Sequence, residues 1–103
     1  MSFAEFAAAI AGPASAPPEL GPALAGLWHD ARGDWVRAHE EVQNDAGAEA
    51  AWVHAYLHRK EGDPGNAAYW YSRAGRSRPE PDVTLQQEWE QIARALLTAG
   101  QRG

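Results

Sequence analysis

Two histidines and a glutamate share one face of a helix that the sequence predicts in the middle of the chain. His54, His58 and Glu61 are four and then three residues apart, a spacing that places side chains on the same side of an α-helix. Neutral imidazole nitrogens and carboxylate oxygens are ligands that suit zinc or iron. With His29 or His39 as a further ligand, this face is a candidate metal site.

The competing interpretation gives these histidines a structural role. The HExxH motif, which supplies a general base in many zinc enzymes, is absent from the sequence. Histidines at helix-packing positions would bond to Asp30, to Glu40 or to a backbone carbonyl. We favour the structural role, so the sequence predicts no cofactor, with zinc or iron as the alternative. No glycine-rich phosphate loop or nucleophile elbow occurs either, and we expect a binding protein rather than an enzyme.

A second set of side chains on the same predicted helix could bind a peptide. Trp52 and Tyr56 share one side of this helix with Arg59 and Lys60. Aromatic rings beside cations suit a peptide that carries a carboxylate. The alternative is that the rings pack on a neighbouring hairpin and the cations complement the negative end of the helix dipole. A protein or peptide is the partner that we expect.

Charge and composition disfavour other partners. The formal net charge is −5, whereas a nucleic-acid binder needs a basic surface. A local excess of cations is the only feature that favours nucleic acid, and it consists of Arg59, Lys60, Arg73, Arg76 and Arg78. Cysteine is absent, which makes the reducing cytoplasm the expected location. No apolar run approaches the roughly 20 residues that span a bilayer, so we expect no membrane contact.

Hydrophobic periodicity predicts an all-α protein of about six helices without strands. A chain of 103 residues, 45% of them hydrophobic, can bury one modest core, so we expect a single domain. Its expected segments are an N-terminal helix with a proline-rich connector (1–17), a first helical hairpin (18–45), a second hairpin (46–79) and a C-terminal capping helix (80–103).

Capping and stop signals set the expected helix ends. Ser2 and Glu5 have the spacing of a capping box, and Gly12–Pro18 reads as a stiff connector. The expected helices are Ser2–Ala11, Pro18 or Pro22 to Arg32, a third capped by Asp34 and ending near Asn44, Ala48–Glu61, about Asn66–Gly75, and a last one from Asp82 or Thr84 to just before Gly100. The second helix is expected to bury Leu20, Leu24, Leu27, Trp28 and Ala31, and the fifth Ala67, Trp70, Tyr71 and Ala74.

The sharpest turn signal is Gly62-Asp63-Pro64. Glycine takes the left-handed position after a helix, and proline cannot continue one. The next helix can then be capped by Asp63, with Pro64 at its first position, or by Asn66. Either choice predicts a tight αα-hairpin.

The hairpin has a counterpart earlier in the chain. Sliding the sequence by 29 residues superimposes His29 on His58, Gly33-Asp34 on Gly62-Asp63 and Ala38 on Ala67, a self-match typical of stacked helix pairs. This pattern resembles the tetratricopeptide repeat, and Asn66–Ala74 is similar to part of the Sel1-like repeat. The resemblance covers about residues 22–79, and it implies a small protein-interaction or scaffold domain. The positions that depart from the repeat pattern are Asp45, Ala50 and Pro64.

Two repeats alone are too few to bury a core. We therefore expect the first and last helices to cover the open faces of the stacked hairpins. A second copy of the chain, forming a homodimer, is the alternative cover.

Overall fold

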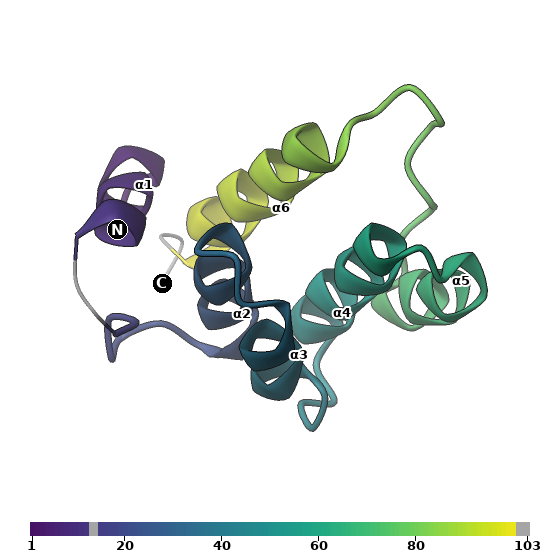
Figure 1. Cartoon of the computed structure of the whole chain (residues 1–103), viewed down its shortest axis with the longest axis horizontal. Coiled ribbons are helices and arrows are strands. Elements are labelled where there is room, and N and C mark those ends of the chain that lie inside the picture. The colour runs from purple at the N-terminus through teal and green to yellow at the C-terminus, as the bar shows by residue number, and fades with distance from the viewer. Residues whose placement is uncertain (13–14, 101–103) are drawn as a thin grey trace.

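The computed structural model describes residues 1–12 and 15–100, and this part of the chain contains six α-helices and no strand. They are α1 (Phe3–Ala11), α2 (Pro22–Ala31), α3 (Trp35–Val42), α4 (Ala48–Glu61), α5 (Pro64–Ala74) and α6 (Leu85–Gly100) (Figure 1). The all-α prediction is confirmed. Part of the predicted connector Gly12–Pro18, residues 13–14, lies outside the described residues, as do residues 101–103 of the C-terminal segment.

Side-chain caps mark the start of four helices, which are α1, α3, α5 and α6. The predicted capping box is present in α1, where the hydroxyl of Ser2 accepts from the N–H of Glu5 and the Glu5 carboxylate accepts from the N–H of Ser2. In α3 the predicted cap is Asp34, which accepts from the N–H of Arg37 at 3.0 Å. Thr84 and Gln87 exchange the same kind of bonds before α6. These bonds satisfy helix N–H groups that have no partner within the helix.

The fifth helix begins two residues earlier than its expected start at Asn66. The carboxylate of Asp63 accepts from the N–H of Asn66 at 3.2 Å, so Asp63 is the cap and Pro64 takes the first helical position. Proline is favoured there because its fixed φ already suits the helix and its missing N–H would have no partner.

The buried side of α2 differs from the predicted stripe. The helix starts at Pro22, which leaves Leu20 outside it, and Ala31 is exposed. Asp30 is buried instead, with only 3% of its surface exposed. A carboxylate tolerates this position because partners from α4 bond to both of its oxygens.

The two hairpins turn in the same way. Gly33 and Gly62 have φ of 82° and 87°, the left-handed region that favours glycine. The N–H of Asp34 donates to the carbonyl of His29 at 3.0 Å, and the N–H of Asp63 donates to the carbonyl of His58 at 2.9 Å. The predicted hairpin at Gly62 is confirmed, and its turn geometry recurs 29 residues earlier.

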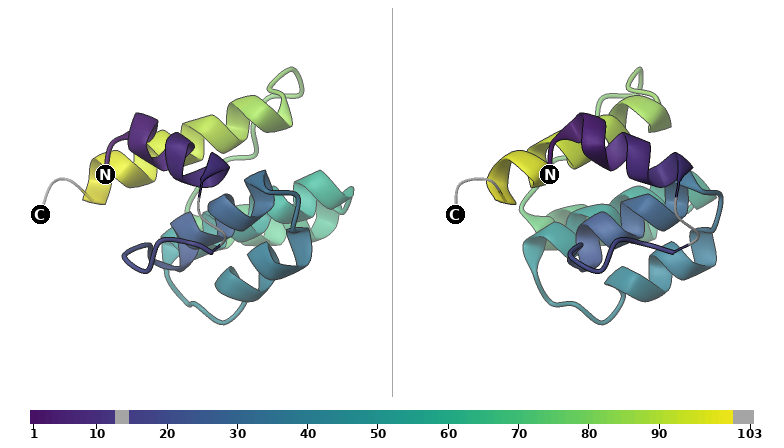
Figure 2. Two further views of the ribbon diagram at one scale, coloured as in Figure 1. Left: turned by 60° about the vertical axis from the view of Figure 1, so that its left-hand side comes forward. Right: turned by 90° about the vertical axis from the view of Figure 1, so that its left-hand side faces the viewer.

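The helices form two layers (Figure 2). One layer is the pair of hairpins, α2–α3 and α4–α5, and the other is α1 packed across α6. Helix α6 packs across both α2 and α4, and the indole N–H of Trp89 donates to the carbonyl of Leu27 at 3.1 Å. The terminal helices therefore lie over one side of the hairpin pair, where Phe6 of α1 stacks on Trp89.

The core is centred on α4, which contacts α2, α3, α5 and α6. Helix α4 is therefore covered on more than one side. Two of the five tryptophans, Trp28 and Trp89, are buried, whereas Trp35, Trp52 and Trp70 are only partly buried. The predicted burial of Trp70 in the fifth helix is thus incomplete. None of the described helices combines the length and the apolar character needed to span a bilayer.

Candidate metal site

Three histidines from two helices meet beside α4. His54 and His58 are one turn apart on α4, and His39 comes from the last turn of α3, which packs on α4. The structure thus selects His39, rather than His29, to join the pair on α4. One ring nitrogen from each of the three side chains lies within 4.8 Å of the other two.

Tryptophans hold two of these rings in place. Trp35, four residues before His39, stacks on its ring at 5.0 Å, and the Trp35 indole donates to the carbonyl of Leu57 at 2.9 Å. Trp70 of α5 stacks on His54, with their ring centroids 3.9 Å apart. The cluster is therefore built by α3, α4 and α5 together, and the ring of His58 stacks on that of His54.

The environment of His39 and His54 favours the uncharged imidazole. His54 and His58 are 4% and 8% exposed, and His39 is half-buried. Burial, and secondly the proximity of His39 and His58, lower the pKa of His54 to about 4. Burial and the neighbouring His58 also lower the pKa of His39. At neutral pH the nitrogen lone pairs of His39 and His54 are therefore available, the state in which histidine binds a metal ion.

Hydrogen bonds within the protein do not satisfy this cluster. The Nε2 atoms of His54 and His39 are 3.0 Å apart and share one hydrogen bond. The Nδ1 atoms of His54 and His58 are buried and have no hydrogen-bond partner among the described residues. A buried polar atom without a partner costs roughly 1–3 kcal/mol, so a structural role alone accounts poorly for these rings.

Glu61 lies beside the cluster and His29 lies apart from it. The Glu61 carboxylate is 3.5 Å from Nδ1 of His58, but it is not one of the groups that converge with His39 and His54. His29 instead faces Glu41, with Nε2 3.6 Å from a carboxylate oxygen. The carboxylates next to His58 and His29 are thus those of Glu61 and Glu41. They are not those of Asp30 and Glu40, which we predicted as acceptors for a structural role.

The four predicted peptide-binding residues do not line one open groove. Tyr56 is 2% exposed and donates to a carboxylate oxygen of Asp30 at 3.0 Å. Lys60 bonds to the other oxygen of Asp30 at 2.8 Å. Burial raises the pKa of Tyr56, which keeps its hydroxyl protonated as a donor. These two side chains join α4 to α2.

The other two candidates also contact parts of this chain. Arg59 forms an ion pair with the buried carboxylate of Glu88 at 2.9 Å and donates to the carbonyl of Val83. Tyr71 of α5 donates to the second oxygen of Glu88. The guanidinium of Arg76 lies over the ring of Trp52, 3.7 Å from the centroid of that ring. Helix α6 therefore lies over the side of α4 from which a peptide was expected to bind.

Asp30 and Glu88 are the buried carboxylates that sequence reasoning did not single out. Each one accepts from a tyrosine and a cation of the second hairpin. Glu88 is next to Trp89, which belongs to an apolar stripe, and this position was the available indication that Glu88 could be buried. Two of the five cations in the local excess noted in the sequence, Arg59 and Lys60, thus form ion pairs within the fold. The guanidinium of a third, Arg73, lies 5.7 Å from the Trp70 ring centroid.

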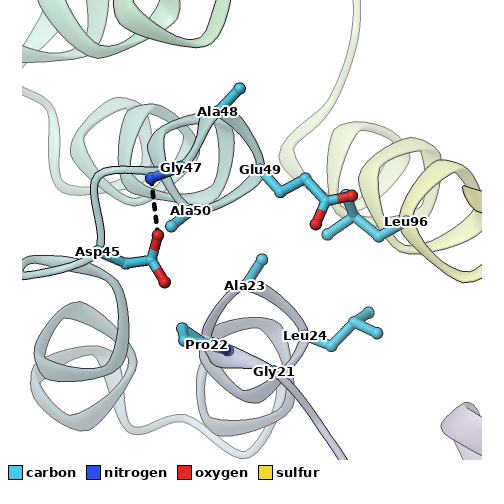
Figure 3. Close-up of a pocket in the computed structure, with 10 residues that line it drawn as sticks. All are labelled: Gly21, Pro22, Ala23, Leu24, Asp45, Gly47, Ala48, Glu49, Ala50 and Leu96. Carbon is cyan, nitrogen blue, oxygen red and sulfur yellow. Dashed lines mark hydrogen bonds between the residues drawn. The ribbon is translucent and has the colours of Figure 1, made fainter. Parts of the chain in front are cut away.

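A cavity of about 490 Å³ lies away from the histidines, between the N-terminal ends of α2 and α4 (Figure 3). Small apolar residues line most of it, together with the carboxylates of Asp45 and Glu49. Asp45 already accepts from the N–H of Gly47 at 2.7 Å, which uses one of the free groups at the start of α4. This cavity therefore offers a ligand less specific chemistry than the histidine cluster.

Comparisons with protein families, with curated proteins and with solved structures find no match for this chain. The resemblance to tetratricopeptide and Sel1-like repeats stays a prediction based on the sequence.

Proposed function

We propose that this protein binds a divalent transition-metal ion through His39, His54 and His58. The observation that carries the proposal is the approach of one nitrogen from each ring to within 4.8 Å of the others. Tetrahedral zinc holds nitrogen ligands about 3.4 Å apart, given bonds of about 2.0–2.1 Å. The Nε2 atoms of His39 and His54 are already 3.0 Å apart, so small ring rotations would seat the ion.

The chemistry of the donors narrows the class of metal. Imidazole nitrogens favour zinc, cobalt, nickel or copper over magnesium and calcium, which prefer oxygen ligands. Two buried nitrogens of the cluster, Nδ1 of His54 and Nδ1 of His58, have no hydrogen-bond partner among the described residues, and an ion bound there would supply one. The proposal thus replaces the structural role that we favoured from the sequence.

Calorimetric titration of metal-free protein with zinc at neutral pH tests the proposal. We expect one ion per chain. Zinc at about 100 times its dissociation constant should raise the free energy of unfolding by roughly 2.7 kcal/mol, because the ion binds only the folded state. This gain is measured by denaturation with and without zinc.

A matched pair of variants separates zinc binding at the histidine cluster from zinc binding elsewhere on the surface. His39→Gln changes a half-buried ligand and should abolish zinc binding with little loss of stability. His29→Gln changes a histidine outside the cluster and should bind zinc like the unchanged protein. Zinc binding by His39→Gln at wild-type affinity would overturn the proposal.

Protein interaction, the function predicted first from the sequence, remains an untested alternative. Because α6 covers one side of α4, a peptide would have to bind elsewhere or displace that helix. The cytoplasmic location and the homodimer likewise stay predictions.

A further inference from the structure

We propose that the metal held by the three histidines keeps one coordination position that a small anion occupies. This inference rests on the proposed function and adds the class of ligand. The converging set contains His39, His54 and His58, and no fourth histidine, aspartate or glutamate of the described residues joins it. Cysteine is absent from the whole sequence. Three protein ligands around a tetrahedral ion leave the fourth position to water or an exogenous ligand.

The carboxylate of Glu61 lies near the cluster but does not join the converging set. Glu61 lies 3.5 Å from Nδ1 of His58, and the set that it forms is with His58 and Asp63. Glu61 is therefore a neighbour of His58 and not a member of the converging set. The Asp63 carboxylate is engaged by Asn66, as the cap of α5.

The charge of the site determines the kind of ligand that fits. Three uncharged imidazoles bring no negative charge of their own to compensate the two positive charges of the ion. Two of the ligands, His54 and His58, are buried, and attraction between opposite charges is stronger there than in water. An anion such as hydroxide, azide or a small carboxylate is thus favoured over a neutral ligand at the fourth position.

The neighbouring rings limit the size of that anion. The three imidazole centroids are 4.7–5.4 Å apart, and indole rings stack on His39 and His54. Half-buried His39 gives the site its side toward solvent. A compact ion can approach from that side, whereas a bulky ligand would have to displace Trp35 or Trp70.

Cobalt-loaded protein and azide provide the test. Cobalt(II) binding is measured first, by calorimetry and by its visible absorption, in the unchanged protein and in His39→Gln. Azide is then titrated into the cobalt-loaded unchanged protein. We expect a saturable change in the visible bands with one azide per cobalt, and the same change in Glu61→Gln, because Glu61 is not a metal ligand.

The outcomes separate the two proposals. Failure of the unchanged protein to bind cobalt more tightly than His39→Gln would remove the metal site and this inference together. Cobalt binding without any azide-dependent change would overturn this inference alone. Azide binding that appears only in Glu61→Gln would also overturn it, because the Glu61 carboxylate would then be the fourth ligand.

Discussion

The turn between α2 and α3 and the turn between α4 and α5 share their backbone hydrogen bonds, but they present different side chains. His29 and His58 occupy equivalent positions before the two glycines. His29 faces Glu41 at the edge of the first hairpin. The position equivalent to Glu41 in the second hairpin is Trp70, whose ring stacks on His54.

This difference shows that the histidine cluster is a product of stacking and not of the repeat unit. His39 reaches His54 and His58 because α3 of the first hairpin packs on α4 of the second. The residue equivalent to His39 in the second hairpin is Ala68. The turn of the second hairpin is therefore associated with a candidate site, and the turn of the first hairpin only with the contact between His29 and Glu41.

The largest expected difference between the hairpins concerns the equivalent buried positions 27 and 56. Leu27→Ala should lower the free energy of unfolding by roughly 2–5 kcal/mol, because it empties a fully buried site. Tyr56→Phe keeps the ring and should cost only about 1–3 kcal/mol, the cost of removing a donor from buried Asp30. Urea denaturation measures both, and equal losses would contradict the distinction between an apolar and a polar contact.

The next effect is a loss of stability in acid that depends on the second hairpin. The pKa of His54 is about 4 in the folded protein, against an ordinary value of 6.5, chiefly because of burial. Between these values the unfolded chain binds a proton that the folded chain excludes. The free energy of unfolding is therefore undiminished by His54 above pH 6.5. It falls as the pH drops toward 4, by about 3 kcal/mol at most.

Denaturation of metal-free protein across that pH range checks the direction of this change in the free energy of unfolding. The variant His54→Gln should lose less unfolding free energy than the unchanged protein between neutral pH and the lower end of the range. An unchanged pH dependence in His54→Gln would mean that another group is responsible.

Substitution of the two turn glycines tests whether the turns are equivalent. Gly33→Val and Gly62→Val should each cost roughly 1–3 kcal/mol, because a β-branched residue is disfavoured at positive φ. A Cβ at either position would meet no atom within 4 Å, so the cost is conformational and should be similar in both. Gly12→Val, where φ is −98°, is the control and should cost less. Comparable denaturation midpoints for all three variants would contradict this account.

The smallest effect is expected at the edge of the first hairpin. His29→Gln removes a ring nitrogen that lies 3.6 Å from a carboxylate oxygen of Glu41, and even an ion pair near the surface contributes only about 0–1 kcal/mol. We therefore expect a change in unfolding free energy below about 0.5 kcal/mol. A loss above about 1 kcal/mol would show that the first hairpin depends on its histidine as much as the second.

Local sequence patterns predicted the helices and the shared turn well. Gly62 and Asp63 carry their own conformational preferences, so the helix end and the cap could be predicted from adjacent residues. The same holds for the capping box of Ser2 and Glu5. Spacing also placed His54 and His58 on one face of α4. Each of these features depends on residues within one turn of helix.

Contacts between distant segments could not be predicted in the same way. The choice between His39 and His29 depends on which side of α4 is covered by α3, and no local pattern contains that information. The buried carboxylates of Asp30 and Glu88 are similar cases, because their partners Tyr56 and Arg59 lie 26 and 29 residues away. A charged residue next to an apolar stripe is ordinarily exposed, and only the tertiary partner makes its burial favourable.

The bond between Trp89 and the carbonyl of Leu27 has a consequence for the order of folding. It joins residues 62 positions apart, whereas each hairpin closes within its own short segment. Closing a long loop costs more chain entropy than closing a short one, and distant contacts slow folding. We therefore expect the hairpins to form first and α6 to dock late. In pulse-labelling hydrogen exchange, amides of α4 and α5 should gain protection before those of α6, and simultaneous protection would contradict this order.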